Sequence, residues 1–252
     1  RDPEMSRGLG DVYKRQTLHR ENQVLVCAQS NTAVDWIAEK LVDRGVPVLR
    51  IGNPSRVNDK MLSFTYERRF EGHPAYTELW GIRKSIREMG NRMRKSSYSE
   101  REAARSRINH LRERATELEI QINEDLFSGA RVIASTLVSS NHRILTGRRF
   151  TTLFIDEAAQ ALEAACWTAI RKADRVIFAG DHCQLPPTIK CIEAAQNGLE
   201  QTLMEKVAAN KQETVSLLKV QYRMHQSIMQ FSSEWFYQGE LQAAPEVTNR
   251  GI

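Results

Sequence analysis

The chain has no run of the roughly 18 to 20 uninterrupted apolar residues that a membrane span needs, and its N-terminus lacks the basic-then-apolar pattern of a secretory signal. The cytoplasm or the nucleus is therefore the expected location, with no membrane partner. Cysteine is scarce too: the four cysteines among 252 residues include no C-x-x-C pair, so a disulfide framework is not expected. His182 and Cys183 are adjacent, but they would bind a metal ion only if distant ligands converged on them.

The composition is otherwise that of a globular protein. Hydrophobic residues make up 41% of the chain and charged residues 27%, which is enough apolar material for a sizeable core. The net charge of +5 is unevenly distributed, because residues 83–114 hold eleven Lys or Arg against four Glu. Such a local excess suits a polyanion such as nucleic acid. A solvated helix face explains the same composition equally well.

Short apolar, β-branched runs bounded by polar turns indicate strands that are buried on both faces of a parallel sheet. They cover residues 24–28, 46–51, 131–136, 151–155, 175–179 and 216–220. Helical patterns cover residues 31–42, 158–170, 198–207 and 225–235. Strands that alternate with helices predict an open α/β fold with right-handed crossovers.

The region of about residues 78–126 interrupts this alternation with two helical stripes. Apolar side chains recur there at spacings of three and four residues, which predicts an antiparallel helical hairpin inserted into the α/β domain. The stripes consist of Leu79, Ile82, Ile86, Met89 and Met93, followed by Ile108, Leu111, Ala115, Leu118 and Ile122.

The two ends of the chain differ from the middle. Residues 1–16, RDPEMSRGLGDVYKRQ, fit neither a strand nor an amphipathic helix, and we expect them to be a leader foreign to the fold. The first domain is expected over residues 17–212. A second domain is expected to begin at residue 213 and to be unfinished at residue 252.

Asp156 and Glu157 directly follow an apolar run, where open α/β sheets bind their ligands. Two adjacent carboxylates at that point suit phosphoryl transfer, in which one acid holds Mg²⁺, usually through water, and the next activates the attacking water. The alternative is a pair of acids favoured by the dipole of a following helix.

The stretch AGDHCQLPP, residues 179–187, ends the next run with Gly180 and Asp181 and places Gln184 three residues further on. A neutral amide in the crevice could contact a terminal phosphate or its attacking water without adding charge. Taken alone, the stretch could be only a polar turn.

Small polar residues also follow two other predicted strands. Ser30 and Asn31 open a helix after the first strand, and Thr136 ends another. Helix N-termini and small hydroxyl or amide groups suit backbone phosphates of nucleic acid. Helix capping by Ser30 or Asn31 is compatible with that interpretation.

The stretch Gln221-Tyr222-Arg223 follows the last predicted strand. Arg223 could reach a transferring phosphate from a second domain as an arginine finger, and Tyr222 could stack on a base. The alternative is a surface arginine near a helix cap.

Four stretches occur in the order AQSNTAVD, FIDEAAQALEAACW, AGDHCQLPP and VQYRMHQSIMQF. They resemble motifs Ia, II, III and IV of the Upf1-like branch of superfamily 1 (SF1B) helicases. The immunoglobulin-mu-binding-protein type is the most similar, because of QALEAACW and WFYQGEL, and the resemblance covers about residues 22–248. It implies a RecA-like P-loop NTPase fold and an ATP-driven 5′ to 3′ translocase that unwinds duplexes along single-stranded DNA or RNA.

The resemblance also implies roles for individual residues. Asp156 would be the Mg²⁺-linked acid, Glu157 the catalytic base, Gln184 the γ-phosphate sensor and Arg223 the finger, while Tyr222 would lie beside adenine. Gln221, Gly180 and Asp181 belong to the same predicted ATP site. The predicted strand-binding residues are Ser30, Asn31, Thr136, Arg83, Lys84, Arg92, Arg94 and Lys95.

The sequence departs from the family at its phosphate-binding loop. No G-x-x-G-x-G-K-[ST] stretch precedes Val24, and the family's late motifs are missing too. We therefore expect a fragment that hydrolyses ATP negligibly without the remainder of its helicase core. One alternative is a non-catalytic nucleic-acid-binding or scaffold protein on a degenerate core. A nuclease that uses Asp156, Glu157 and Asp181 is a weaker alternative, because Gln184 would have no task.

Overall fold

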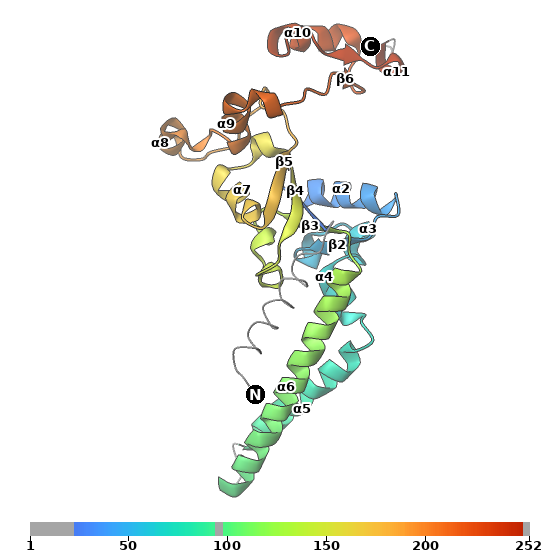
Figure 1. Cartoon of the computed structure of the whole chain (residues 1–252), viewed down its shortest axis with the longest axis vertical. Coiled ribbons are helices and arrows are strands. Elements are labelled where there is room, and N and C mark those ends of the chain that lie inside the picture. Colours follow the sequence, from blue (N-terminus) through green and yellow to red (C-terminus); the bar gives the residue numbers. More distant parts are fainter. Residues whose placement is uncertain (1–22, 94–97, 249–252) are drawn as a thin grey trace, which may run out of the picture.

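The structure, a computed structural model, describes residues 23–93 and 98–248. Its centre is a parallel sheet of five strands in the order β2-β3-β1-β4-β5 (Figure 1). The strands are β1 (Val24–Ala28), β2 (Val48–Ile51), β3 (Val132–Thr136), β4 (Phe150–Asp156) and β5 (Ala173–Phe178). The sheet confirms the predicted α/β class. The prediction that every strand is buried on both faces is wrong for β5, which lies at an edge and is partly exposed.

Helices cover both faces of the sheet because alternate residues of each strand point to opposite sides. One face packs against α2 (Asn31–Val42) and α3 (Asp59–Leu62), and Val26 and Ala28 of β1 belong to this core. The other face packs against α7 (Glu163–Ile170), α9 (Leu203–Asn210) and the end of α6, and Leu25 and Cys27 of β1 belong to that core. The layers are those of a RecA-like P-loop NTPase.

The predicted hairpin is present and projects from the sheet as a long arm (Figure 1). It consists of α5 (Tyr76–Met93) and α6 (Tyr98–Ser128), and α4 (Tyr66–Glu71) packs near its base. Leu79 of α5 and Ala115, Leu118 and Ile122 of α6 form its buried core. Phe127 at the end of α6 belongs to the core of the sheet, so the arm is rooted in the domain.

The helix predicted over residues 158–170 is interrupted. A 3-10 turn, Ala158–Gln160, comes first, and α7 begins only at Glu163. The physical reason is that the Ala158 N–H donates to Ala179 O across two loops at 2.9 Å. The turn is thus held by the neighbouring strand end.

The helix predicted over residues 198–207 also begins later. Gly198 adopts φ of 92°, which breaks the helical path after the short α8 (Ile192–Ala194). Helix α9 starts after Thr202, whose side chain and that of Glu205 form a reciprocal capping box.

The strand predicted over residues 216–220 is wrong for most of its length. Only β6 (Val220–Gln221) is a strand, and it pairs in parallel with β7 (Gln242–Ala243) in a separate two-stranded sheet. The preceding apolar residues have no strand beside them and stay exposed, with Leu218 at 87%. Helices α10 (Gln226–Phe236) and α11 (Pro245–Thr248) complete this C-terminal segment.

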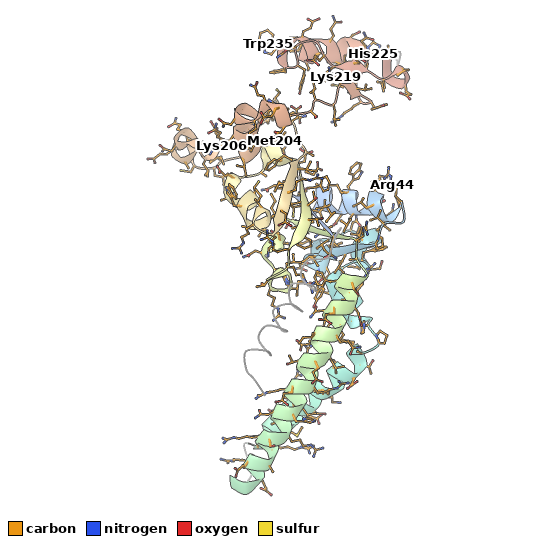
Figure 2. The ribbon with its side chains drawn as sticks, in the orientation of Figure 1. Arg44, Met204, Lys206, Lys219, His225 and Trp235 are labelled. Carbon is orange, nitrogen blue, oxygen red and sulfur yellow. The ribbon has the colours of Figure 1, made fainter. Side chains whose placement is uncertain are left out.

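Helix α10 begins at Gln226, one residue later than predicted, because His225 is its N-cap and accepts from the Ser227 N–H through its ring. Figure 2 shows His225 and Trp235 towards opposite ends of this helix. Phe231 and Trp235 stack with ring centroids 6.0 Å apart, and both are exposed. In the described part of the chain, no helix is both long and apolar enough to cross a bilayer. The predicted leader lies outside the described residues.

Candidate nucleotide site and nucleic-acid interface

The strand register brings Asp156 and Thr136 to the same end of the sheet, whereas Gln221, Tyr222 and Arg223 belong to the separate C-terminal segment. Ala28 at the end of β1 pairs with Asp156 on one side and with Thr136 on the other. Strand β5 runs beside β4, so the loop that contains Gln184 leaves the same edge. Carboxyl ends of parallel strands are where open α/β sheets bind ligands.

The two adjacent acids differ in environment. Asp156 is half-buried, and no side chain of the described residues pairs with its carboxylate, so its oxygens are available as ligands for a hard cation. Glu157 is exposed and has a left-handed backbone, with φ of 52°, which is uncommon for a residue other than glycine. The chain turns sharply at Glu157 and presents its carboxylate to solvent at the sheet edge.

Gly180 has a packing role that the sequence did not reveal. A Cβ atom at this position would lie 3.0 Å from Ala158 N, 3.1 Å from Ala159 N and 3.1 Å from Met204 Sδ. The loop after β5 therefore lies tightly against the turn after β4, and a side chain at position 180 would force these neighbours to move by a few tenths of an ångström. Figure 2 labels Met204, on α9 above β5.

Asp181 organises the loop that follows. Its Oδ1 accepts a hydrogen bond from Cys183 N at 3.0 Å, and its Oδ2 accepts from Gln184 Nε2 at 2.9 Å and from the Tyr237 hydroxyl. Burial pushes the pKa of Asp181 upward, but these hydrogen bonds outweigh it and hold the pKa below its usual value. Gln184, the predicted sensor, thus donates its amide to a neighbouring carboxylate.

The adjacent histidine and cysteine do not gather distant ligands. The ligand atoms of Asp181, His182 and Cys183 lie within 4.8 Å of one another, but they come from consecutive residues. Burial, followed by the charge of Asp181, raises the pKa of the Cys183 thiol, which opposes metal binding as a thiolate. The distant partners that a metal site required are not among this group.

The N-terminus of α2 contains the predicted strand-binding residues Ser30 and Asn31. Ser30 Oγ accepts from Ala33 N at 3.1 Å, which is the capping role foreseen from the sequence. Asn31 Oδ1 accepts from Arg50 Nη2 at 2.9 Å, so its amide N–H groups remain for an anion.

Arg50 and Asp35 were missed by the sequence reasoning. Both are buried, and Arg50 Nε donates to Asp35 Oδ1 at 2.8 Å. A signal was present, because Arg50 stands inside an otherwise apolar strand and a charge there requires a buried partner.

The side chains of Thr136 and Gln221 form hydrogen bonds with residues two or three positions further along the chain. Thr136 Oγ1 donates to Ser139 Oγ at 2.9 Å and accepts from Ser139 N at 3.1 Å. Gln221 Oε1 accepts from the N–H groups of Arg223 and Met224, each at 2.8 Å, and folds the turn that carries Tyr222 and Arg223. Tyr222 and Arg223 are themselves exposed.

The hairpin neutralises part of its own positive charge. Arg83 pairs with Glu119 at 2.6 Å, and Arg114 pairs with Glu78 at 3.0 Å, both between the two helices. Lys84 Nζ lies 5.5 Å from the centre of the Trp80 ring, a cation–π contact. Arg92 is exposed. Arg94 and Lys95 lie outside the described residues.

A parallel sheet covered on both faces, with acids at the end of the inner strand β4, is the arrangement found in RecA-like P-loop NTPases. Two family models agree with this class. A model described as "AAA domain" matches residues 4–191, and a second one described as "AAA domain" matches residues 199–252.

Sequence relatives agree as well. DNA-binding protein SMUBP-2 of Rattus norvegicus is 34% identical over 238 residues, covering 92% of this chain and 24% of the relative. DNA polymerase alpha-associated DNA helicase A of Schizosaccharomyces pombe is 32% identical, covering 94% and 35%. The Regulator of nonsense transcripts 1 homolog of Arabidopsis thaliana is 36% identical, covering 91% and 18%.

The chain belongs to the AAA-domain family, within the Upf1-like branch of superfamily 1 helicases. It spans about a quarter to a third of the length of the first two of these relatives.

Proposed function

We propose that this chain is part of an ATP-driven helicase that moves 5′ to 3′ along single-stranded DNA or RNA. The observation that carries the proposal is the shared sheet edge, where the end of β4 with Asp156 and Glu157 lies beside the loop with Gln184. The names of two relatives, one a DNA helicase and one an ATP-dependent helicase, support the helicase part of this proposal. The cytoplasm or the nucleus, where nucleic acids are handled, belongs to this proposal as the location.

The chemistry assigns a task to each acid. Asp156 would hold Mg²⁺ through water molecules, as an outer-sphere ligand, and bound Mg²⁺ would neutralise phosphate charge. Glu157 would take the proton of the attacking water as general base. Gln184 would donate its amide to the terminal phosphate.

The C-terminal segment would complete the ATP site. Arg223 would stabilise charge on the transferring phosphate, and Tyr222 would lie against adenine. The internal hydrogen bonds of Gln221 support a positioning role for it. Gly180 and Asp181 would act likewise, by shaping the loop that carries Gln184. The division into a first domain of residues 17–212 and a second from residue 213 is part of this proposal.

Nucleic acid would lie across the adjoining part of the sheet edge. The N-terminus of α2 with Ser30 and Asn31 suits backbone phosphates, and Thr136 ends the neighbouring strand. The hairpin, with Lys84, Arg92, Arg94 and Lys95, would add positive charge along the path of the strand.

A non-catalytic nucleic-acid-binding or scaffold protein is the second candidate. The observation that favours it is the missing G-x-x-G-x-G-K-[ST] loop, since neither its lysine nor its hydroxyl is supplied by these 252 residues. We therefore expect negligible ATP hydrolysis by the 252-residue chain, with the remainder of a helicase core as a required partner.

Magnesium-dependent ATP hydrolysis separates the two candidates. In a helicase core completed with a phosphate-binding loop before Val24, Glu157→Gln should lower turnover by ~10²-fold or more with ATP binding retained. Glu163→Gln, an acid elsewhere on the same domain, is the control. Absence of turnover in the completed core would favour the scaffold. Near-normal turnover in the Glu157 variant would refute its role.

A further inference from the structure

A hydrogen bond links the predicted sensor loop to the C-terminal segment. The Tyr237 hydroxyl donates to Asp181 Oδ2, and these two residues are 56 positions apart in the chain. Beside this contact, Cys183 Sγ lies 3.9 Å from Phe236 O. Two adjacent contacts therefore join the loop after β5 to the end of α10.

Tyr237 stands in a structured turn. Its N–H donates to Ser233 O at 3.0 Å, and Gly239 N donates to the same oxygen at 2.8 Å. Ser233 is buried, and its Oγ accepts from Leu241 N at 3.1 Å. These bonds fix the end of α10, and hence the backbone position from which the phenol reaches Asp181.

The oxygen that accepts from Tyr237 also accepts from Gln184. Gln184 Nε2 donates to Asp181 Oδ2 at 2.9 Å. An ionised carboxylate is an acceptor only, and so are the non-bridging oxygens of a terminal phosphate. The amide N–H groups of Gln184 therefore face two competing acceptors, Asp181 and the phosphate.

We propose that Tyr237 is a positioning residue that couples the C-terminal segment to Gln184 through Asp181. While Tyr237 donates to Asp181 Oδ2, Gln184 leaves the carboxylate at a lower cost, because the oxygen keeps a donor. When the C-terminal segment withdraws, Gln184 is the donor that remains for this oxygen and is held on it. The inference rests on the proposed function only in the role given to Gln184.

The surroundings support this coupling. Asp181 is half-buried, so a carboxylate oxygen without a donor is penalised there. Burial, followed by the hydrogen bond to Asp181, raises the pKa of Tyr237, so the phenol keeps its proton at neutral pH.

The Cys183 thiol reports on the contact without any nucleotide. In a Cys191→Ser background of the 252-residue chain, Tyr237→Phe should raise the rate of Cys183 modification by a disulfide reagent by roughly two- to tenfold, the range set by loss of one hydrogen bond. Tyr66→Phe is the matched control, because it removes a phenol hydrogen bond to Asn123 far from the loop. An unchanged rate in Tyr237→Phe would overturn the contact.

A double variant distinguishes loss of this hydrogen bond from a general destabilisation of the fold. Asp181→Ala should raise the Cys183 rate by a larger factor, because it also removes the charge that raises the pKa of the thiol and the acceptor of the Cys183 N–H. Adding Tyr237→Phe to Asp181→Ala should have no further effect. Independent, multiplying effects would contradict a shared hydrogen bond.

The side-chain amide of Gln184 tests positioning directly. Its NMR signals, assigned by their loss in Gln184→Ala, should shift in Tyr237→Phe and stay in place in Tyr66→Phe. Unchanged Gln184 signals in Tyr237→Phe would show that Tyr237 does not position Gln184. None of these measurements needs ATP, so their failure leaves the helicase proposal standing, and a failed ATPase assay leaves this contact standing.

Discussion

Arg50 Nε donates to Asp35 Oδ1 at 2.8 Å, and this ion pair is buried between strand β2 and helix α2. The remaining groups are satisfied as well: Arg50 Nη1 donates to Ile51 O, and Asp35 Oδ2 accepts from Asn58 N at 2.9 Å. A buried pair of this kind is tolerated because every charge has partners. It also fixes Asn31 at the start of α2.

Removing one partner of this pair should be strongly destabilising. Asp35→Ala would leave the Arg50 charge buried without its counter-ion, at a cost of about 3–5 kcal/mol. Urea unfolding followed by circular dichroism measures the loss. Lys60→Ala, which breaks the exposed pair of Lys60 and Glu39, is the control and should change stability little. Equal effects of the two variants would contradict the importance of burial.

The four cysteines should differ in reactivity. Burial raises the pKa of Cys27 to about 12 and that of Cys166 to about 11, so both stay protonated and covered at pH 8. Cys191 is exposed and should react first with a thiol reagent, followed by Cys183. Cys27 and Cys166 should react only after denaturant is added. Simultaneous modification of all four thiols in the native protein would contradict the burial of Cys27 and Cys166.

Gly180→Ala should push two loops apart. The new methyl group would meet backbone nitrogen atoms of Ala158 and Ala159, which cannot rotate away, and overpacking of this kind costs about 1–3 kcal/mol. Thermal unfolding is the measurement. Gly81→Ala in helix α5 is the control, because nothing lies within 4 Å of the added atom and Ala favours a helix. An unchanged melting temperature for Gly180→Ala would refute the close approach.

Arg223 should matter for hydrolysis more than for strand binding. In a completed helicase core, Arg223→Ala is expected to slow ATP turnover by ~10³-fold or more, the worth of an arginine finger. Fluorescence anisotropy with a labelled single strand should give nearly unchanged affinity. A variant that loses affinity but keeps turnover would assign Arg223 to the strand.

The hairpin should contribute to the salt dependence of strand binding. Neutralising Lys84, Arg92, Arg94 and Lys95 together should flatten the slope of log affinity against log salt, because each phosphate contact releases counterions. Arg83→Gln alone should have a smaller effect than Lys84→Gln, since Arg83 already pairs with Glu119. An unchanged slope would show that these hairpin residues do not contact the phosphates of the strand.

The central strands were predictable because their signal is local. A continuous apolar run such as residues 24–28 has one favourable position, inside a parallel sheet, and β1 matches it. The hairpin was predictable for the same reason, since its apolar spacing alone defines its packed face.

Features set by contacts between distant residues could not be predicted. The break before α7 depends on the Ala158 N–H reaching Ala179 O, and no pattern within residues 158–170 encodes that bond. The same holds for Tyr237, whose partner Asp181 is 56 residues away. The strand predicted over residues 216–220 was wrong for residues 216–219, because the described part of the chain places no strand beside them and only Val220 pairs with β7.

The exposed apolar side chains on α10 and just before it affect the solubility of this chain. Leu218, Phe231 and Trp235 are each more than half exposed, and salt screens the repulsion that a net charge of +5 provides between molecules. Concentrated samples should therefore self-associate, and the tendency should grow with added salt.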